Sequence, residues 1–331
     1  MNAPYSEVSL QPSMTPNIVL IDAISRSGKA IFSDLIPSLT KMEHIQFCTE
    51  LELISQGLLL GGVSPEYARA FVRIYLNERS YNLQLSRNVN FRPKDQTGIP
   101  NYKNPETYFE RLNRDDGDSI VPICSSEDVV IPINTHELLA NFQHFKNLEV
   151  GFKMISLWRN PVDVIYSWIM RGWDHRFNEN DPRSFSLNVR RGSKILPWYF
   201  ALPTLTGANV EGAELCANVV FALIDAARAN YLTADRSQIL LVTYEDICMQ
   251  TDRELQTICT FLQVETTGFT EIAKKKARLP QPITNTERLN KLKFLESRLT
   301  ESTLEKLSGL HLSYERDLYG MRELTDATLA N

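Results

Sequence analysis

One segment near the N-terminus decides the fold: Asn17-Ile18-Val19-Leu20-Ile21-Asp22-Ala23-Ile24-Ser25-Arg26-Ser27-Gly28-Lys29-Ala30. Residues 17–22 form a short apolar run bounded by Pro16 and by the small residues that follow, which is typical of a buried strand. From Lys29 the sequence favours a helix that continues to about Ile36 and ends before Pro37. The segment therefore predicts a strand, a loop and a helix in direct succession.

Short apolar runs of the same kind recur along the chain, with helical patterns between several of them. They lie at residues 45–48, 120–124, 129–133, 153–158 and 238–243. Strands that alternate with helices usually join in parallel. The sequence therefore predicts a three-layer α/β/α fold around a central, mainly parallel sheet of the P-loop-like kind.

Two helix starts are marked by their residues. Arg159-Asn160-Pro161 places a proline at the first helical position, directly after a predicted strand. Thr251-Asp252-Arg253-Glu254 has the pattern of a capping box, with a threonine hydroxyl at one end and a glutamate at the other. The C-terminal region is predicted to be helical.

Residues 17–320 are predicted to form a single domain, with flexible segments at 1–16 and 321–331. Within the domain, residues from about 88 to 118 are polar, contain three prolines and lack apolar periodicity. We expect an irregular insertion there. It is either a lid over a binding site or a plain surface excursion.

Composition limits the possible partners and the compartment. The 331 residues carry a net charge of −5, which offers no long-range attraction to nucleic acid or to an anionic membrane. No segment approaches the ~18 uninterrupted apolar residues of a membrane span. The five cysteines form no CxxC pair, which favours the reduced cytoplasm, and the scattered histidines predict no metal site.

The loop between the predicted strand and helix has the parts of a phosphate site. Gly28 allows close approach of an anion to the backbone, and Arg26 and Lys29 supply positive charge. The alternative is an ordinary turn with solvated basic residues. A Walker A loop is not formed, because Ala23 stands at the first glycine position and Ala30 at the hydroxyl that would hold Mg²⁺.

Arg26-Ser27-Gly28 resembles the 5′-phosphosulfate loop of sulfotransferases, enzymes that transfer a sulfuryl group from 3′-phosphoadenosine 5′-phosphosulfate (PAPS). Lys29 and Ala30 depart from the hydroxyl residues common there. The resemblance implies that the loop binds the cofactor, with no metal and with 3′,5′-diphosphoadenosine (PAP) as product. The residues it assigns to this role are Ser25, Arg26, Ser27, Gly28, Lys29 and Ala30.

A second segment, residues 154–167, resembles the family's 3′-phosphate element. An apolar strand ends in Arg159, Asn160-Pro161 starts a helix, and Ser167 follows eight residues after the arginine. The resemblance implies that Arg159 and Ser167 hold the 3′-phosphate. The alternative is a structural ion pair between Arg159 and Asp163, with Ser167 on the surface.

The resemblance also implies the catalytic groups. Asn134-Thr135-His136-Glu137 occupies the place of a Lys-Thr-His segment, with Asn134 replacing the lysine. His136 is the expected general base, because imidazole accepts a proton near neutral pH, and Glu137 is the alternative base. Arg26 and Lys29 are expected to stabilise charge on the leaving phosphate oxygen.

The acceptor is expected to be a hydroxyl or amine of a small molecule or carbohydrate. The aromatic stretches 168–173 and 198–200 could wall its pocket, although Trp168 is the one we expect in the core. Arg278 and Arg288 are weak candidates for a further cofactor contact. Two other functions stay open, a small-molecule kinase and a nucleotide-binding protein without activity, and the sequence does not define the oligomeric state.

Overall fold

The computed structural model describes residues 8–15, 17–148, 150–173, 185–205 and 211–322. Most of the predicted flexible segments 1–16 and 321–331 lies outside these residues. The part of the first segment that is described, 8–15, runs along helix α3 (Pro65–Gln84), where the backbone N–H of Met14 donates to Asn77 Oδ1 at 2.8 Å. At the other end, Met321 is fully buried.

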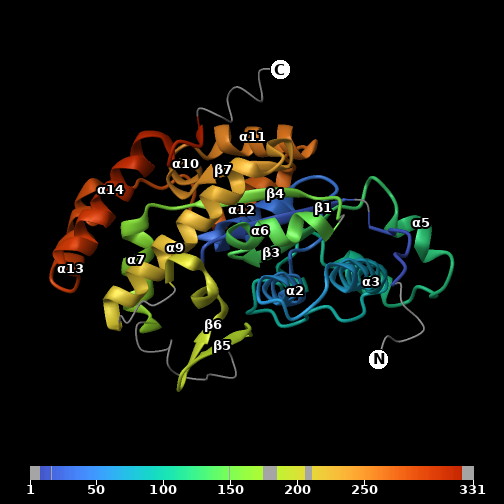
Figure 1. Ribbon diagram of the computed structural model, residues 1–331. Coiled ribbons are helices and arrows are strands. Elements are labelled where there is room, and N and C mark those ends of the chain that lie inside the picture. The colour runs from blue at the N-terminus through green and yellow to red at the C-terminus, as the bar shows by residue number, and fades with distance from the viewer. Residues whose placement is uncertain (1–7, 16, 149, 174–184, 206–210, 323–331) are drawn as a thin grey trace, which may run out of the picture.

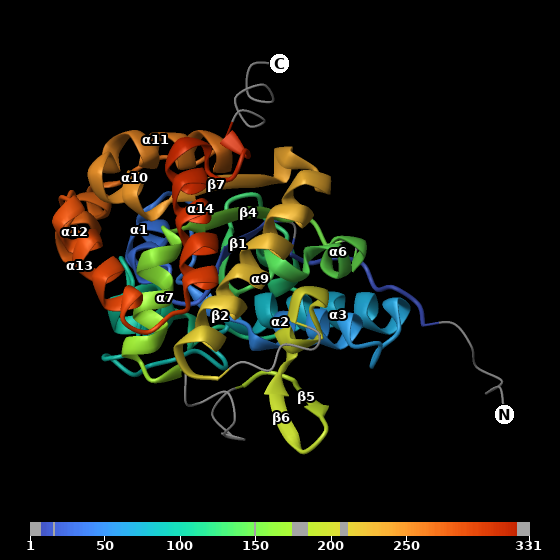
Figure 2. The ribbon, with the colours of Figure 1, turned by 60° about the vertical axis from the view of Figure 1, so that its left-hand side comes forward.

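A five-stranded parallel sheet lies at the centre of the molecule, in the order β2-β3-β1-β4-β7 (Figure 1). The strands span Ile18–Ala23 (β1), Gln46–Phe47 (β2), Ile131–His136 (β3), Lys153–Trp158 (β4) and Ile239–Thr243 (β7). Each lies within three residues of a predicted strand. A separate antiparallel hairpin projects below the sheet (Figure 2), formed by β5 (Asn188–Arg191) and β6 (Lys194–Pro197).

One predicted strand is wrong. Residues 120–124 form a short helix, α5 (Ile120–Cys124), which packs against α3. Pro122 explains the difference, because proline has no N–H for a sheet ladder but is tolerated in the first turn of a helix. A run of five apolar residues has too little periodicity to separate the two states.

Helices cover both faces of the sheet (Figures 1 and 2). Their bounds are Phe32–Leu35 (α1), Thr49–Leu59 (α2), Pro65–Gln84 (α3), Glu106–Arg111 (α4), Phe142–Phe145 (α6), Pro161–Met170 (α7), Gly212–Thr233 (α9), Tyr244–Met249 (α10), Thr251–Leu262 (α11), Gly268–Lys276 (α12), Asn285–Glu296 (α13) and Glu301–Asp317 (α14). Single 3₁₀ turns lie at Lys29–Ile31 (η1), Ile36–Ser38 (η2), Ile99–Asn101 (η3), Leu139–Asn141 (η4), Lys146–Leu148 (η5), Trp198–Ala201 (η6), Pro203–Leu205 (η7) and Arg236–Gln238 (η8).

Alternation along β1 separates two hydrophobic clusters. Ile18 and Leu20 face a cluster built with α2, α3, α6, α7 and α9, whereas Val19, Ile21 and Ala23 face one built with α1, α10, α11 and α12. A strand that is buried on both faces needs a continuous apolar run, which is what residues 18–23 provide. The predicted three-layer fold with a helical C-terminal region is confirmed.

Of the two predicted helix starts, the one at Pro161 is confirmed and the capping box at Thr251 is not. Asn160 caps α7 through its side-chain oxygen, which accepts from the N–H of Val162 at 3.1 Å, and Pro161 is the first helical residue as predicted. The predicted capping box at Thr251 is wrong. Because α10 ends only two residues earlier, the Thr251 hydroxyl donates instead to the carbonyl of Ile247 at 2.8 Å. The predicted helix from Lys29 is a sequence of short turns (η1, α1, η2) that continues past Pro37 to Ser38.

The insertion at residues 88–118 is fastened to the body of the protein. Tyr108 and Arg111 of α4 are buried, and both reach the carboxylate of Glu43, at 2.6 Å from the tyrosine hydroxyl and 2.7 Å from the guanidinium. Burial would raise the pKa of Glu43, but its hydrogen bonds to Arg111, Tyr108 and Gln84 hold it below its ordinary value. This anchoring favours the surface-excursion interpretation for most of the segment.

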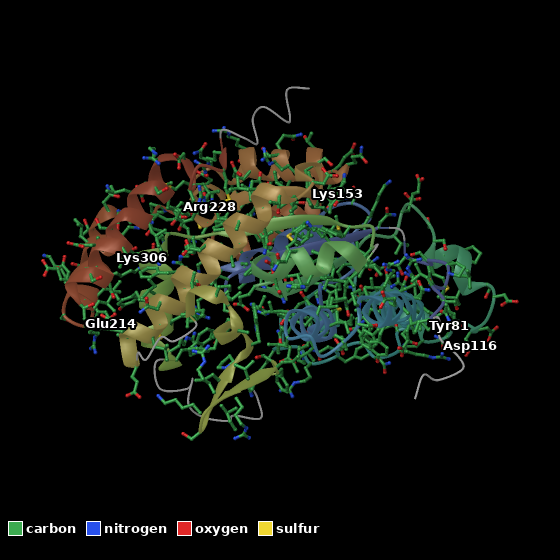
Figure 3. All side chains as sticks on the ribbon, in the orientation of Figure 1. Tyr81, Asp116, Lys153, Glu214, Arg228 and Lys306 are labelled. Atoms are coloured by element: carbon green, nitrogen blue, oxygen red, sulfur yellow. The ribbon has the colours of Figure 1, made fainter. Side chains whose placement is uncertain are left out.

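Helix α9 is the long central helix of its layer and packs against α14. The hydroxyl of Thr303 donates to Glu214 at 2.5 Å, and Lys306 lies 3.7 Å from Asp225, so two polar contacts join the first turns of α14 to α9 (Figure 3). Length and composition alone would let α9 cross a membrane, but 67% of its most apolar window is buried inside the protein, as in the core helix of a folded domain.

Candidate active site

The predicted site residues meet at the carboxyl end of the sheet. Strand β1 lies between β3 and β4, and in the register Ala23 is opposite His136. Loop 24–28 follows β1, His136 ends β3, and Arg159 follows β4. In parallel α/β sheets, ligands bind outside the carboxyl ends of the strands.

Gly28 fixes the shape of the loop. Its φ of 95° lies in the left-handed region, and a Cβ built on it would stand 2.3 Å from the ring of Tyr244, the first residue of α10. Arg26 also adopts a positive φ, 74°. The loop is held from the other side by Trp168, whose Nε1 donates to the carbonyl of Ser25 at 2.7 Å. The expectation that Trp168 is buried holds, since it is 1% exposed, and its N–H supports the loop.

The loop and the second predicted element are in direct contact. Arg26 Nε donates to Ser167 Oγ at 3.1 Å, and Arg159 donates to the carbonyl of Arg26 at 3.4 Å. The Arg159 guanidinium lies over the Tyr244 ring, 4.1 Å from its centroid. Arg26 thus forms one cluster with residues 133 and 141 positions further along the chain, which only the fold brings together.

This cluster carries positive charge without acidic partners. Within the described part of the chain, neither Arg26 nor Arg159 forms an ion pair, and the buried Nε of Arg159 has no hydrogen-bond partner. Burial lowers the pKa of Arg26, and the nearby positive charges of Arg171 and Arg159 lower it further. Clustered guanidiniums of this kind are a site for an anion, which they can hold by bidentate hydrogen bonds.

The alternative interpretation of Arg159 is not observed. Asp163, its candidate ion-pair partner, pairs with Arg288 at 3.1 Å and with Lys291. Burial would raise the pKa of Asp163, but Lys291, Arg159 and Arg288 together hold it below its ordinary value. Asp163 is thus paired with Arg288 and Lys291, and no ion pair among the described residues joins it to Arg159.

Lys29 points from the loop towards β3. Its ammonium donates to the backbone carbonyl of Thr135. Burial lowers its pKa, and the carboxylates of Asp22, Glu52 and Glu137 offset part of that effect. Lys29 therefore ties the loop to the strand that carries His136.

His136 is partly exposed at the end of β3, and its ring is fixed on two sides. Nδ1 lies 3.1 Å from Glu52 Oε1, and the imidazole stacks parallel to Phe47 with 6.0 Å between ring centroids. The alternative base, Glu137, is already engaged, because its carboxylate accepts the N–H of Ser25 at 2.7 Å. Burial raises the pKa of Glu137.

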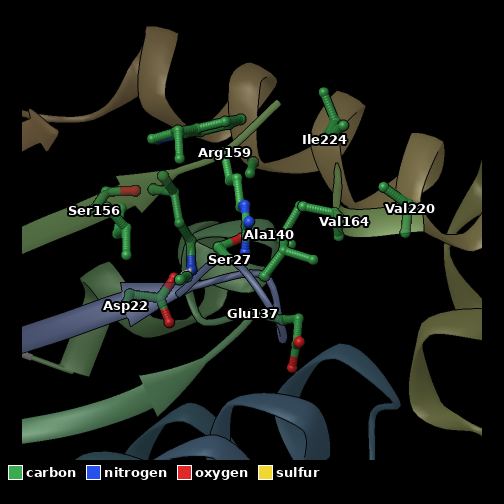
Figure 4. A pocket seen from close by; sticks show the side chains of 15 residues that line it. Asp22, Ser27, Glu137, Ala140, Ser156, Arg159, Val164, Val220 and Ile224 are labelled. Atoms are coloured by element: carbon green, nitrogen blue, oxygen red, sulfur yellow. Dashed lines mark hydrogen bonds between the residues drawn. The ribbon is translucent and has the colours of Figure 1, made fainter. Parts of the chain in front are cut away.

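A cavity of about 660 Å³ opens in front of these groups. It is lined by the loop, His136 and Arg159, and by aromatic side chains, which include Phe47, Trp173, Phe185, Trp198 and Tyr199. Ala30 lies at its edge, and Gln96 is the contribution of the 88–118 insertion. A smaller cavity of about 20 Å³ lies beneath the loop between Ser27, Ser156 and Arg159 (Figure 4), with room for about one water molecule.

Comparison with known proteins identifies the family. The family model described as "Sulfotransferase domain" matches residues 19–307. The chain belongs to the sulfotransferase family. The match spans the loop, the Arg159 element and the strand that carries His136.

Solved structures similar to this sulfotransferase include three that are themselves sulfotransferases. They are the sulfotransferase domain from the curacin biosynthetic pathway (11% identity, TM-score 0.43, covering 86% of this chain and 99% of that one), a sulfotransferase from Alicyclobacillus acidocaldarius (13%, 0.39, 93% and 98%) and a sulfotransferase from Mycobacterium avium (12%, 0.43, 91% and 77%). A search of curated protein sequences found no match.

The late basic residues of this sulfotransferase do not line the large cavity. Arg288 is buried between three carboxylates, those of Asp163, Glu245 and Glu315, at 2.5–3.1 Å. Two of the three lysines of α12 form ion pairs, Lys274 with Asp252 and Glu271 and Lys276 with Asp34. Arg278, at a positive φ of 58°, also lies outside the cavity lining.

Two features of the site could not be found from the sequence pattern. Glu52 lies on α2, 84 residues before His136, and nothing in its neighbours distinguishes it from other helix glutamates. Tyr244 directly follows strand β7, and its contact with Gly28 depends on the fold. Among the described residues, no three His, Cys, Asp or Glu side chains cluster as metal ligands would.

Proposed function

We propose that this sulfotransferase takes its sulfuryl group from PAPS. The observation that carries the proposal is the pair of neighbouring guanidiniums, Arg26 and Arg159. Arg159 donates to the backbone carbonyl of Arg26 and Arg26 donates to the hydroxyl of Ser167, and neither has an acidic partner among the described residues. Arg26 and the loop N–H groups would hold the 5′-phosphosulfate, and Arg159 with Ser167 the 3′-phosphate. The reduced cytoplasm is the proposed location, because all five cysteines are buried free thiols.

The proposed reaction is an in-line displacement at sulfur. The acceptor oxygen forms the new S–O bond while the bond between sulfur and the 5′-phosphate oxygen breaks, and PAP leaves. His136 takes the acceptor's proton, and Arg26 and Lys29 stabilise the charge on the leaving oxygen. Each of these groups lines the same cavity.

The cavity supports an acceptor with a flat apolar body. Its lining includes several aromatic rings, together with the polar side chains of Gln56 and Asn188. Rings of this kind stack on aryl groups and on the apolar faces of sugars. We propose a hydroxyl or amine on a small molecule or carbohydrate as the acceptor, with the hydroxyl group directed at His136.

The donor assignment is tested by calorimetric titration with PAP. Arg159→Ala should lower the affinity about 10- to 10²-fold, because a charged hydrogen bond to phosphate contributes about 1.5–3 kcal/mol. Arg298→Ala is the matched control, since Arg298 stacks on Phe294 outside the cavity and should leave the affinity unchanged. Equal affinity in wild type and Arg159→Ala would exclude the assignment.

Two further outcomes separate the rival functions. Tighter binding of ATP with Mg²⁺ than of PAP would favour the kinase. Binding of PAP without transfer from labelled PAPS to any acceptor of a broad panel would favour a nucleotide-binding protein without activity. An unimpaired His136→Ala enzyme would remove His136 from the mechanism.

A further inference from the structure

We propose that Glu52 is a positioning residue that fixes the tautomer and orientation of His136. The catalytic role of Glu52 rests on the proposed function, whereas its contact with His136 is independent of that function. Glu52 Oε1 accepts the backbone N–H of His136 at 2.8 Å and lies 3.1 Å from Nδ1 of the same residue. One carboxylate oxygen thus holds both the backbone and the ring.

The geometry determines which ring nitrogen carries the proton. An ionised carboxylate has no proton to donate, so a neutral imidazole beside it places its hydrogen on the facing nitrogen. Nδ1 is therefore the donor, and Nε2 keeps its lone pair. Among the described contacts Nε2 has no partner, and the ring lines the large cavity. Nε2 is therefore the nitrogen that can take the proton from the hydroxyl of the acceptor substrate.

Glu52 is itself held in place. It lies in the first turn of α2, where the helix dipole favours negative charge, and its side chain is only 12% exposed. His136 also lies nearly parallel to the ring of Phe47, with 6.0 Å between the ring centroids, and this contact favours the same ring orientation. After proton transfer, the same carboxylate would lie against an imidazolium and stabilise its charge, which is the role of the acid in other base-orienting pairs.

The first experiment measures the tautomer directly, in the protein without donor or acceptor. Long-range ¹H–¹⁵N spectra of ring-labelled histidine, at a pH where His136 is neutral, should show the Nδ1–H form in the wild type. The His136→Gln spectrum assigns the signal by its absence. Glu52→Ala should move the population towards Nε2–H, while Glu52→Gln, whose amide oxygen can still accept, should keep more of the Nδ1–H form.

Glu50→Ala is the matched control. Glu50 lies two residues away on the same helix, bonds to the hydroxyl of Tyr75 at 2.7 Å and does not line the cavity. It should leave the His136 signal unchanged. The proposal is overturned if wild-type His136 is in the Nε2–H form, or if Glu52→Ala leaves its tautomer as in the wild type.

The second experiment is kinetic. Loss of an orienting carboxylate from a base costs up to about 10⁴ in kcat in the best-studied triad, so we expect at least about 10² for Glu52→Ala. The affinity for PAP should change less than roughly twofold, because among the described contacts Glu52 forms no hydrogen bond with Arg26 or Arg159. Glu52→Gln should recover part of kcat.

The two experiments fail independently. If no acceptor receives a sulfuryl group, the proposed function fails while the NMR result still decides whether Glu52 sets the tautomer. If transfer occurs and kcat of Glu52→Ala equals that of the wild type, the positioning role fails while the sulfotransferase assignment stands.

Discussion

At the scale of single residues, Gly28 meets two constraints at once, a left-handed backbone and a ring against its α-carbon. We predict that Gly28→Ala lowers affinity for PAP at least about tenfold. The new methyl group would push Tyr244 away, and the Arg159 guanidinium that lies on that ring would lose its support. Calorimetric titration measures the change.

Gly117→Ala separates the two constraints. Gly117 also has a positive φ, 109°, but a Cβ there would meet nothing within 4 Å. It should cost the same left-handed backbone penalty of about 1–2 kcal/mol in stability without any loss of PAP affinity. If the two variants bind PAP equally well, contact with Tyr244 is not what shapes the loop.

The residues that sequence could predict are those whose chemistry is local. Arg26, Ser27 and Gly28 lie in one turn after a strand, and their residue types are enough to predict an anion loop. Glu52 could not be found in this way, because its partner is 84 residues distant and only the packing of α2 against β3 brings them together. Chemistry carried by a short motif is visible in one sequence, whereas orientation by a distant helix is not.

At the scale of elements, the turn that carries Arg159 is fixed from the C-terminal helices. Arg288 of α13 bonds to Asp163 of α7, Glu245 of α10 and Glu315 of α14, and Asn160 bonds to Glu315 at 3.1 Å. From the sequence, Arg288 was a candidate for a contact with the cofactor. The structure instead gives it acidic partners on three helices, which lie together at one end of the molecule (Figure 2).

We predict that Arg288→Met lowers the free energy of unfolding by about 3 kcal/mol. The substitution leaves two largely buried carboxylates with less compensation, although Lys291 still pairs with Asp163. Urea denaturation measures the loss. Lys293→Met, on an exposed position of the same helix, should change the value by less than about 0.5 kcal/mol. Equal stability of the two variants would contradict the network.

The misassigned elements have a common cause. Residues 120–124 were apolar enough for a strand, and residues 251–254 had the side chains of a capping box. In both cases another residue nearby decided the outcome. Pro122 has no N–H to donate to a sheet, and the Thr251 hydroxyl donates to a carbonyl of α10 instead of capping its own helix. By contrast, the longer apolar runs at β1 and β4 were predictable because burial on both faces leaves few other states.

At the scale of the whole molecule, stability should depend on pH through a buried pair beneath the 88–118 insertion. Burial lowers the pKa of His44 to about 4 from an ordinary 6.5, and the nearby Glu43 and Asp34 offset only part of the effect. Between these values the unfolded chain binds a proton that the folded protein does not. Stability therefore rises with pH across this window and is lost as the pH falls through it.

Acidification from pH 6.5 to about 4 should remove about 3 kcal/mol through His44. Below about pH 4.5, protonation of Glu43, whose pKa is lowered in the folded state, adds to the loss. Replacing His44 by phenylalanine keeps a ring beside Tyr102 and removes the titrating group, so the slope of unfolding free energy against pH between 6.5 and 4.5 should flatten. His144→Phe, at a less buried histidine, should flatten it less. Urea titrations at half-unit pH intervals measure both slopes. If the His44→Phe slope equals that of the wild type, His44 binds its proton alike in the folded protein and in the unfolded chain, and the prediction is wrong.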